Sequence, residues 1–302
     1  MTQEQAHLPL QPVGNETEEW QEINDHQLYT MRFESAIQPP QATLVLVHGF
    51  GEHCRRYDHV SRAFAAQGIE VQTYDQRGFG RTGRKSGQLG HTQGIDQLHR
   101  DLTAMSDQVR RPGVPHFIFG HSMGGMITLS YAARHQGTAK LAGIIASGPA
   151  ILLPPNVHEH PIIERTGIFL SKYLKSFTLK TRIQLEDLCK DPQVIEAARE
   201  DYYFYNIGSL QCLGDMLTVG PELIQSGAQT FACPLLLLHG SADVTTDPKG
   251  SRDFFANLPA ALDKEYVEYD GALHELHNEP IKDEVVDKYI TWIHSRAKGQ
   301  KS

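Results

Sequence analysis

A serine flanked by two glycines stands at the centre of the segment FGHSMGG, residues 119–125. The spacing Gly120-x-Ser122-x-Gly124 is typical of a nucleophile elbow, a sharp strand-to-helix turn that exposes a serine hydroxyl. Glycines are needed there because larger side chains would collide with the neighbouring backbone. The chain contains 26 glycines, so the pattern alone is a weak indication. The residues that would activate Ser122 have to be found elsewhere.

Two candidate partners of Ser122 follow apolar segments later in the chain. Asp243 comes three residues after PLLLLHG, and His274 follows EYVEYDG. A neutral imidazole can take the serine proton during attack, and a buried carboxylate can stabilise the resulting imidazolium. We therefore predict a catalytic triad of Ser122, His274 and Asp243. Asp247 is an alternative acid, and His277 is an alternative base.

The same reaction needs hydrogen-bond donors for the oxyanion that forms on the attacked carbonyl. The backbone N–H of Met123 follows the serine at the start of a predicted helix, whose positive dipole end faces the site. The turn HGFGEH, residues 48–53, follows another apolar segment and can direct the Phe50 N–H to the same point. We predict that these two amides form the oxyanion hole.

The elements that position these residues alternate along the chain. Around Asn24-Asp25 the pattern predicts an edge hairpin. Strands are predicted at 43–49, 70–75, 116–120, 143–148, 234–240 and 265–271, and helices at 57–67, 95–110, 123–135, 249–258 and 281–297. This alternation predicts an α/β fold, with a mostly parallel central sheet and helices on both faces. The chain order Ser, Asp, His is that of the α/β-hydrolase fold.

The alternation is interrupted between Pro154 and about Ala232, where no strand is predicted. We predict a helical cap over residues 151–228, while residues 1–150 and 229–302 form the two parts of the α/β-hydrolase core. One predicted helix in the cap has a cationic face with Arg165, Lys172 and Lys175. Its apolar face contains Ile162, Thr166, Phe169, Leu170, Tyr173, Leu174 and Phe177. Such a face either packs on the core or contacts a lipid surface.

The segment GFGRTG, residues 78–83, matches the pattern of a dinucleotide-binding loop. That function requires a helix to open directly after the glycines. The polar, glycine-rich segment RKSGQLGHTQG that follows predicts a loop instead, so we expect no dinucleotide site there.

Composition excludes several other classes of protein. The chain of 302 residues has a formal net charge of −8 and no basic tract, so a nucleic acid partner is not expected. Its four cysteines lack metal-binding spacing and predict neither a zinc site nor disulfides, which favours the cytoplasm. No apolar segment reaches the ~18 residues that span a bilayer. Any membrane association is therefore expected to be peripheral.

Several segments together resemble the monoacylglycerol lipases of the α/β-hydrolase superfamily. They occur in order between about residues 44 and 280: LVHGFGEHCRRY, YDQRGFGRTG, FGHSMGGMITLSYA, ASGPAILL, LLLLHGSADVTTDPKGS and EYDGALHELHNE. The resemblance implies hydrolysis of monoacylglycerols to a fatty acid and glycerol, without a metal or other cofactor. It also implies a helical cap that touches a membrane or lipid droplet.

The resemblance assigns roles to individual residues as well. The family's catalytic residues fall on Ser122, Asp243 and His274, and its oxyanion amides fall on Phe50 and Met123. The bulky side chain of Phe50 is expected to narrow the acyl pocket.

The polar end of the site, which holds the glycerol, falls by resemblance on Glu52, Arg56 and His277. A lysophospholipase or general carboxylesterase with the same triad remains an alternative function. A lipid-binding homologue without catalysis is a second alternative.

Overall fold

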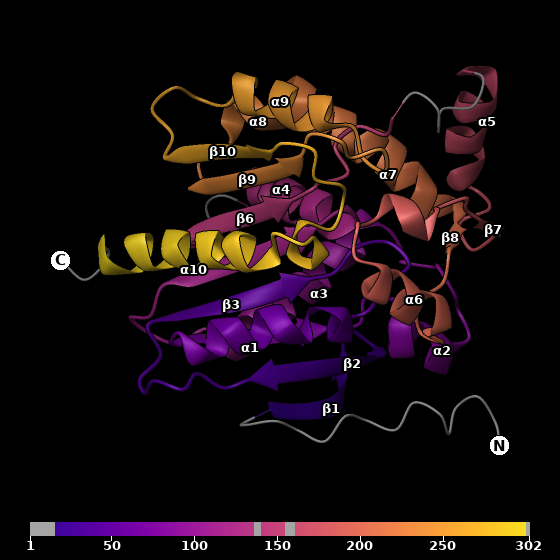
Figure 1. Ribbon diagram of the computed structural model, residues 1–302. Helices are drawn as coiled ribbons and strands as arrows, with labels where there is room; N and C mark the ends of the chain where they lie inside the picture. Colours follow the sequence, from indigo (N-terminus) through magenta and orange to yellow (C-terminus); the bar gives the residue numbers. More distant parts are fainter. Residues whose placement is uncertain (1–15, 136–139, 155–160, 300–302) are drawn as a thin grey trace.

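The computed structural model describes residues 16–135, 140–154 and 161–299. An eight-stranded sheet lies at its centre, in the order β1-β2-β4-β3-β5-β6-β9-β10 (Figure 1). Strand β2 runs antiparallel to both of its neighbours, and every other neighbouring pair is parallel. The strands are β1 Glu16–Ile23, β2 His26–Phe33, β3 Ala42–Val47, β4 Ile69–Tyr74, β5 His116–His121, β6 Gly143–Ser147, β9 Leu235–Gly240 and β10 Lys264–Tyr269. The predicted fold class is confirmed.

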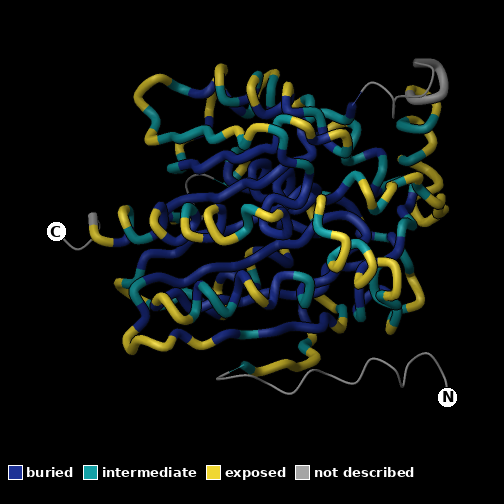
Figure 2. The backbone as a smooth tube through the Cα atoms, in the orientation of Figure 1, coloured by how far each residue is buried: buried dark blue, intermediate teal, exposed yellow. Residues whose placement is uncertain are grey.

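The predicted edge hairpin is also present, formed by β1 and β2. Its two turn residues, Asn24 and Asp25, have φ angles of 48° and 60°. Positive φ angles at both positions let a two-residue turn match the twist of the two strands that it joins. The five central strands are buried along their whole length, as Figure 2 shows. Helices cover both of their faces, which explains why their sequences are largely apolar without alternation.

The helices form two layers, one on each face of the sheet (Figure 1). Helices α1, Asp58–Ala66, and α10, Lys282–Gly299, pack on one face. The other face carries α3, Ile95–Val109, α4, Met123–Arg134, and α9, Pro248–Asn257. Each layer buries its own apolar cluster against the sheet. The sheet is therefore held rigid from both sides, and its strand ends can position reactive groups.

The chain between β6 and β9, here called the insertion, has a more mixed structure than predicted. It contains α5 Pro161–Ser171, β7 Thr178–Lys180, α6 Pro192–Glu200, β8 Ile207–Ser209, α7 Leu210–Glu222, a π-helix Leu223–Gly227 and α8 Ala228–Thr230. Strands β7 and β8 pair antiparallel, so the prediction of a segment without strands is wrong. Three-residue strands are too short to produce a recognisable alternation of polar and apolar residues.

The amphipathic helix predicted in the insertion is shorter than expected. Helix α5 ends at Ser171, so Tyr173, Leu174 and Phe177 lie beyond it, in the connection to β7. The carbonyl of Phe177 accepts a hydrogen bond from Leu210 N–H at the start of α7, and β7 begins at the next residue. These contacts draw the chain out of the helical path. The side chain of Ile162 lies outside the described residues.

A second correction concerns GFGRTG, where the structure contains a short helix, α2, Gly80–Ser86. The Asp75 carboxylate accepts hydrogen bonds from the N–H groups of Arg81 and Cys54, at 2.6 and 2.9 Å. A Cβ atom on Gly83 would lie 2.2 Å from the Tyr205 hydroxyl of the insertion. The glycines therefore serve close packing, and an acid already occupies the start of the helix.

Candidate active site

The elbow around Ser122 joins the end of β5 to the start of α4. Ser122 has φ 54° and ψ −121°, a strained backbone for a residue with a side chain. A Cβ atom on Gly120 would lie 2.4 Å from the carbonyl oxygen of Gly124. A Cβ atom on Gly124 would lie 2.3 Å from the carbonyl oxygen of Val47 in β3. Both glycines are thus needed for the elbow to fit against the sheet.

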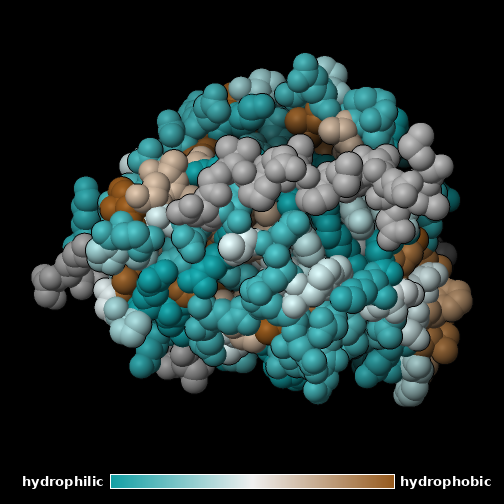
Figure 3. Space-filling view, turned by 90° about the horizontal axis from the view of Figure 1, so that it is seen from below, coloured by the Kyte–Doolittle hydropathy of each residue, from teal (hydrophilic) through white to brown (hydrophobic). Residues whose placement is uncertain are grey.

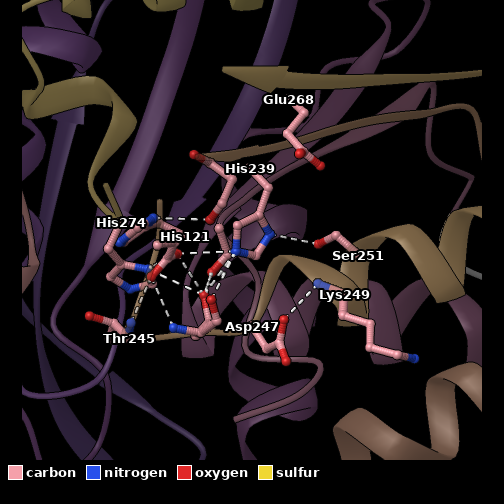
Figure 4. A network of polar contacts seen from close by, with 12 residues as sticks. His121, His239, Thr245, Asp247, Lys249, Ser251, Glu268 and His274 are labelled. Carbon is pink, nitrogen blue, oxygen red and sulfur yellow. Dashed lines mark hydrogen bonds and ion pairs between the residues drawn. The ribbon is translucent and has the colours of Figure 1, made fainter. Parts of the chain in front are cut away.

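The structure brings the predicted acid and base into direct contact. Asp243 follows β9 and His274 follows β10, and these two strands are neighbours. His274 Nδ1 lies 2.7 Å from Asp243 Oδ2, and both side chains are buried. Asp243 also accepts hydrogen bonds from the backbone N–H groups of Thr245 and Thr246 and from the Thr246 hydroxyl, at 2.8, 3.0 and 2.9 Å. Figure 4 shows this network from close by.

The electrostatics of this pair favour a charged acid and a basic imidazole. Burial alone would raise the pKa of Asp243, but the charge of His274 and hydrogen bonds from His239 and His274 hold it well below its usual range. Burial alone would lower the pKa of His274, but the charge of Asp243 and its hydrogen bond raise the pKa above the ordinary histidine value. The arrangement can therefore stabilise an imidazolium.

Ser122 and His274 approach the same stretch of backbone after β6. Ser122 N–H donates to the carbonyl of Ser147, and the carbonyl of Ser122 accepts from Ala150 N–H. A Cβ atom on Gly148 would lie 3.3 Å from His274 Nδ1. Among the described residues, no hydrogen bond joins the Ser122 hydroxyl to His274. In free enzymes such catalytic contacts commonly tighten only when substrate binds.

The proposed oxyanion amides lie on two different elements. Met123 is the first residue of α4, so its N–H has no acceptor within the helix. Phe50 lies in the turn after β3, and Tyr205 of the insertion donates its N–H to the next residue, Gly51, at 2.9 Å. His48 stabilises the same turn, with Nδ1 2.7 Å from the Gly49 carbonyl oxygen and Nε2 accepting from Gln76 N–H.

The ring of Phe50 connects the core to the insertion. It packs edge-on against Phe79, with ring centroids 5.3 Å apart. On its other side, a Cβ atom on Gly208 in β8 would lie 2.8 Å from Phe50 Cε2. The ring is buried between these elements and anchors the turn that carries its amide.

Glu52 is the predicted glycerol-binding residue that lies beside the serine. A Cβ atom on Gly49 would lie 2.7 Å from Glu52 Oε1 and 3.0 Å from Ser122 Cβ. Oε1 is 3.8 Å from His121 Nε2, and Oε2 has no hydrogen-bond partner among the described residues. Burial, together with the charge of Glu275, raises the pKa of Glu52 to about 7. The carboxyl group can therefore donate or accept a hydrogen bond near neutral pH.

The other two predicted glycerol-binding residues point elsewhere. Arg56 Nη2 contacts both carboxylate oxygens of Glu275, at 2.6 and 2.7 Å, and its Nε lies 3.7 Å from Glu52 Oε2. The ring of His277 stacks on Tyr57, with centroids 4.6 Å apart, and is fully buried. Arg56 is thus paired with Glu275, the residue that follows His274. His277 packs against Tyr57.

The two alternatives for the triad have ordinary structural positions. Asp247 is the N-cap of α9 and accepts a hydrogen bond from Lys249 N–H. His277 lies in the short 3-10 turn Leu276–Asn278.

Three histidines of the site were not singled out by the sequence: His48, His121 and His239. His48 and His239 each end an apolar strand in an HG pair, which is the one signal that could have indicated them.

The described residues contain neither a membrane-spanning helix nor a metal-binding cluster. No helix in the described ranges is long and apolar enough to cross a bilayer. Within the same ranges, no group of three or more His, Cys, Asp and Glu side chains is arranged to hold a metal ion.

A hollow of about 190 Å³ lies between α4 and the π-helix and is lined by residues such as Ser130, Arg134 and Leu223. None of the proposed site residues lines it.

The fold and the elbow define an α/β-hydrolase, and comparisons with known proteins specify the family. The family described as "Serine aminopeptidase, S33" matches residues 38–281. The monoacylglycerol lipase of Mycolicibacterium smegmatis is 31% identical over 84% of this chain and 88% of its own length. The monoglyceride lipase of Saccharomyces cerevisiae is 30% identical over 77% of each chain.

Solved structures agree with this result. A soluble variant of the Saccharomyces cerevisiae monoglyceride lipase, in complex with a substrate analogue, superimposes with a TM-score of 0.82 and 25% identity. The match covers 96% of this chain and 99% of that one. The protein therefore belongs to the serine aminopeptidase S33 family of α/β-hydrolases, and the predicted kinship with monoacylglycerol lipases is confirmed.

Proposed function

We propose that this protein is a serine hydrolase that cleaves monoacylglycerols to a fatty acid and glycerol. The observation that carries this proposal is the hydrogen bond between His274 and Asp243, at the sheet edge where the elbow presents Ser122. Similarity to monoacylglycerol lipases supports the choice of substrate.

Acylation begins when the Ser122 hydroxyl turns towards His274 Nε2 and Oγ attacks the ester carbonyl carbon. The hydroxyl proton passes to Nε2, and Asp243 stabilises the imidazolium through Nδ1–H. The N–H groups of Phe50 and Met123 stabilise the oxyanion. When the tetrahedral intermediate collapses, the carbon–alkoxy bond breaks, and His274 returns its proton to the glycerol oxygen. Glycerol leaves, and the acyl group remains on Oγ.

Deacylation repeats the same chemistry with water. His274 takes a proton from the water as its oxygen attacks the acyl carbon, and the same amides hold the second oxyanion. The bond to Ser122 Oγ then breaks, and the proton on His274 passes to Oγ. The fatty acid is released, and the free enzyme is restored.

Glu52 is our candidate for the contact with the glycerol hydroxyls. Its carboxyl group lies beside Ser122 and has one oxygen without a hydrogen-bond partner among the described residues, and a pKa of about 7 allows it to donate or accept a hydrogen bond. Arg56 and His277 would then act behind it, with Arg56 linking Glu52 to the loop of the base.

A substrate panel tests this function. We expect kcat/KM for a long-chain monoacylglycerol to exceed that for a lysophosphatidylcholine and a methyl ester of the same acyl chain by at least about tenfold. Ser122→Ala should lower turnover by several orders of magnitude without loss of the fold. Preference for the lysophospholipid would indicate a lysophospholipase, and activity that falls with chain length, whatever the alcohol, would indicate a general esterase. No turnover of any ester would indicate a non-catalytic lipid binder.

We also propose that the insertion acts as a cap that contacts a membrane or lipid droplet from the cytoplasm. Large hydrophobic side chains are exposed around the end of α5 and in β7: Phe169, Leu170, Tyr173, Leu174, Phe177 and Leu179. Arg165, Lys172, Lys175 and Lys180 are exposed beside them. Hydrophobic residues gather on the right in Figure 3, the side on which the insertion lies in Figure 1. Apolar side chains with flanking cations are typical of interfacial binding.

Vesicle binding tests this surface. The double variant Tyr173→Ser, Phe177→Ser should raise KM for vesicle-borne monoacylglycerol about tenfold, because it removes apolar area that would enter the lipid. The matched control is Ile37→Ser, which removes an exposed hydrophobic residue before β3. Equal binding of the double variant and this control to anionic vesicles would reject the lipid contact.

A further inference from the structure

A second histidine contacts the carboxylate of the proposed triad. His239, at the end of β9, has Nε2 3.0 Å from Asp243 Oδ2, the same oxygen that contacts His274 Nδ1 at 2.7 Å. Its side chain is fully buried, and its Nδ1 lies 2.8 Å from the hydroxyl of Ser251 in α9. Figure 4 shows His239 between Ser251 and the network around His274.

The surroundings of His239 determine which ring nitrogen carries the proton. An ionised carboxylate only accepts hydrogen bonds, so Nε2 must be the donor towards Asp243. The carbonyl oxygen of Thr246, 3.3 Å from Nε2, is a further acceptor on that side. In the neutral ring Nδ1 must then accept, and the Ser251 hydroxyl is in position to donate. The Asp243 carboxylate thus fixes the tautomer, and the Ser251 hydroxyl holds the ring in place from its other nitrogen.

We propose that His239 is a positioning residue that shares the Asp243 carboxylate with His274 and keeps Oδ2 in line with His274 Nδ1. The inference rests on the proposed triad. Asp243 lies on a loop beyond β9, whereas His239 belongs to the rigid strand itself. Its N–H therefore ties the acid to the sheet and withdraws charge from Oδ2.

Two effects should follow if this N–H is removed. Asp243 would lose a fixed reference to the sheet, and small misplacements of catalytic groups are costly to the rate. Oδ2 would also carry more charge and bind the imidazolium more strongly, which would raise the pKa of His274.

Other charged or titratable groups face the pair of His239 and His274: His121 at the end of β5, Glu52, Glu275 beside the base, and Glu268 on β10, which pairs with Arg252. None of them contacts Oδ2, and all remain in the variants below.

Two variants of His239 separate its two contacts. His239→Gln can keep a donor near the position of Nε2 and lose the contact with Ser251, whereas His239→Asn does the reverse. With p-nitrophenyl acetate as substrate, we expect His239→Asn to lower kcat about 10- to 100-fold with little change in KM, and to move the acid limb of the kcat/KM profile to higher pH. The kcat of His239→Gln should stay within about threefold of the wild-type value, with an unchanged acid limb.

Equal kcat values and equal acid limbs for the two variants would overturn the proposal, as would a loss confined to KM. If His239→Asn does not fold, Ser251→Ala provides the test. Without the hydroxyl the ring is held less firmly and its N–H to Asp243 weakens, so kcat should fall about threefold with a shift of the acid limb in the same direction; no change in either would overturn the proposal. Because p-nitrophenyl acetate is a soluble ester that reports on the triad itself, this test does not depend on the proposed substrate. Wild-type protein that cleaves it but spares monoacylglycerol would reject only the substrate, and full activity of Ser122→Ala would reject the triad itself.

Discussion

Two buried carboxylates border the proposed site, and their pKa values move in opposite directions. Asp243 and Glu52 are almost equally hidden, at 5% and 4% exposure. Even so, the pKa of Asp243 is held well below its usual range, whereas that of Glu52 is raised to about 7. Burial by itself raises the pKa of both groups, so the difference must come from their partners.

The partners of the two groups differ in number and in charge. Asp243 accepts hydrogen bonds from two histidines, one hydroxyl and two backbone N–H groups. Glu52 has one oxygen without a hydrogen-bond partner in the described part of the chain, and the charge of Glu275 nearby disfavours its ionisation. The charge of His274 and the hydrogen bonds outweigh the desolvation of Asp243. For Glu52, the charge of Arg56 offsets only part of the effect of burial and of Glu275.

The comparison indicates a division of work between the two acids. A permanently ionised Asp243 suits the partner of an imidazolium, while a carboxyl group that changes protonation near neutral pH suits contact with an alcohol. Opposite pKa shifts in neighbouring carboxyl groups are a common way for one site to hold two roles.

Asp243→Asn should produce the largest effect, because it removes the charge and changes the hydrogen-bond pattern that orients His274. We expect kcat to fall about 10³- to 10⁴-fold, with a loss of roughly 2 kcal/mol of unfolding free energy. Steady-state kinetics and urea unfolding measure both. The matched control is Asp247→Asn, which changes only a helix cap; a similar kcat for both variants would contradict the role of Asp243.

Arg56→Met tests the cation that offsets Glu52 and Glu275. Removing it leaves two buried carboxylates without their counter-charge, so the unfolding free energy at pH 7 should fall by about 3 kcal/mol. Arg62→Met is the control, because Arg62 is one-third exposed and pairs with Glu16 at the edge of the molecule. That control should lose less than about 1 kcal/mol. Equal losses in urea unfolding would show that the Arg56 cluster is not special.

The pH dependence of kcat/KM should report the base that Asp243 supports. In the proposed mechanism His274 takes the serine proton in its neutral form, and its pKa is raised. Activity should therefore fall about tenfold per pH unit below a midpoint that lies above the ordinary value of about 6.5. A profile that stays flat between pH 5 and 9 would remove His274 from this role.

Glu52→Gln should have the smallest effect on activity and the opposite effect on stability to Asp243→Asn. The pKa of Glu52 is higher in the folded chain than in the unfolded chain, so ionisation of Glu52 lowers the free energy of unfolding above pH 7. This loss disappears as the pH falls towards the pKa of the unfolded chain. The amide removes that cost, so the variant should be more stable than the wild type by about 1 to 3 kcal/mol at pH 9. The gain should shrink towards zero at pH 5, and kcat/KM should fall only a few-fold. A loss of stability at pH 9 would contradict the shift of Glu52.

Much of the fold was predictable because its signals are local. The apolar segments that became β3, β5 and β9 and the Asn24-Asp25 turn each report a steric or burial requirement of a few residues. The elements that were missed depend on distant parts of the chain. Helix α2 has its start bound by Asp75 and packs under Tyr205, and β7, which begins at Thr178 after α5 has ended at Ser171, pairs with the distant β8.

The proposed site divides in the same way. The elbow and the chain order of Ser122, Asp243 and His274 can be read from spacing. The positions of Arg56 and His277 could not, since Arg56 meets Glu275 across 219 residues of sequence.

By itself, the sequence determined the alternating elements, the sharp turn at Ser122 and the two strand ends that carry its candidate partners, because these follow from short-range periodicity and sterics. Only the tertiary structure decided that His239 shares the carboxylate of Asp243, and that two equally buried acids have opposite pKa shifts. Those properties depend on which donors and charges long-range packing places around each group, and spacing along the chain does not encode them.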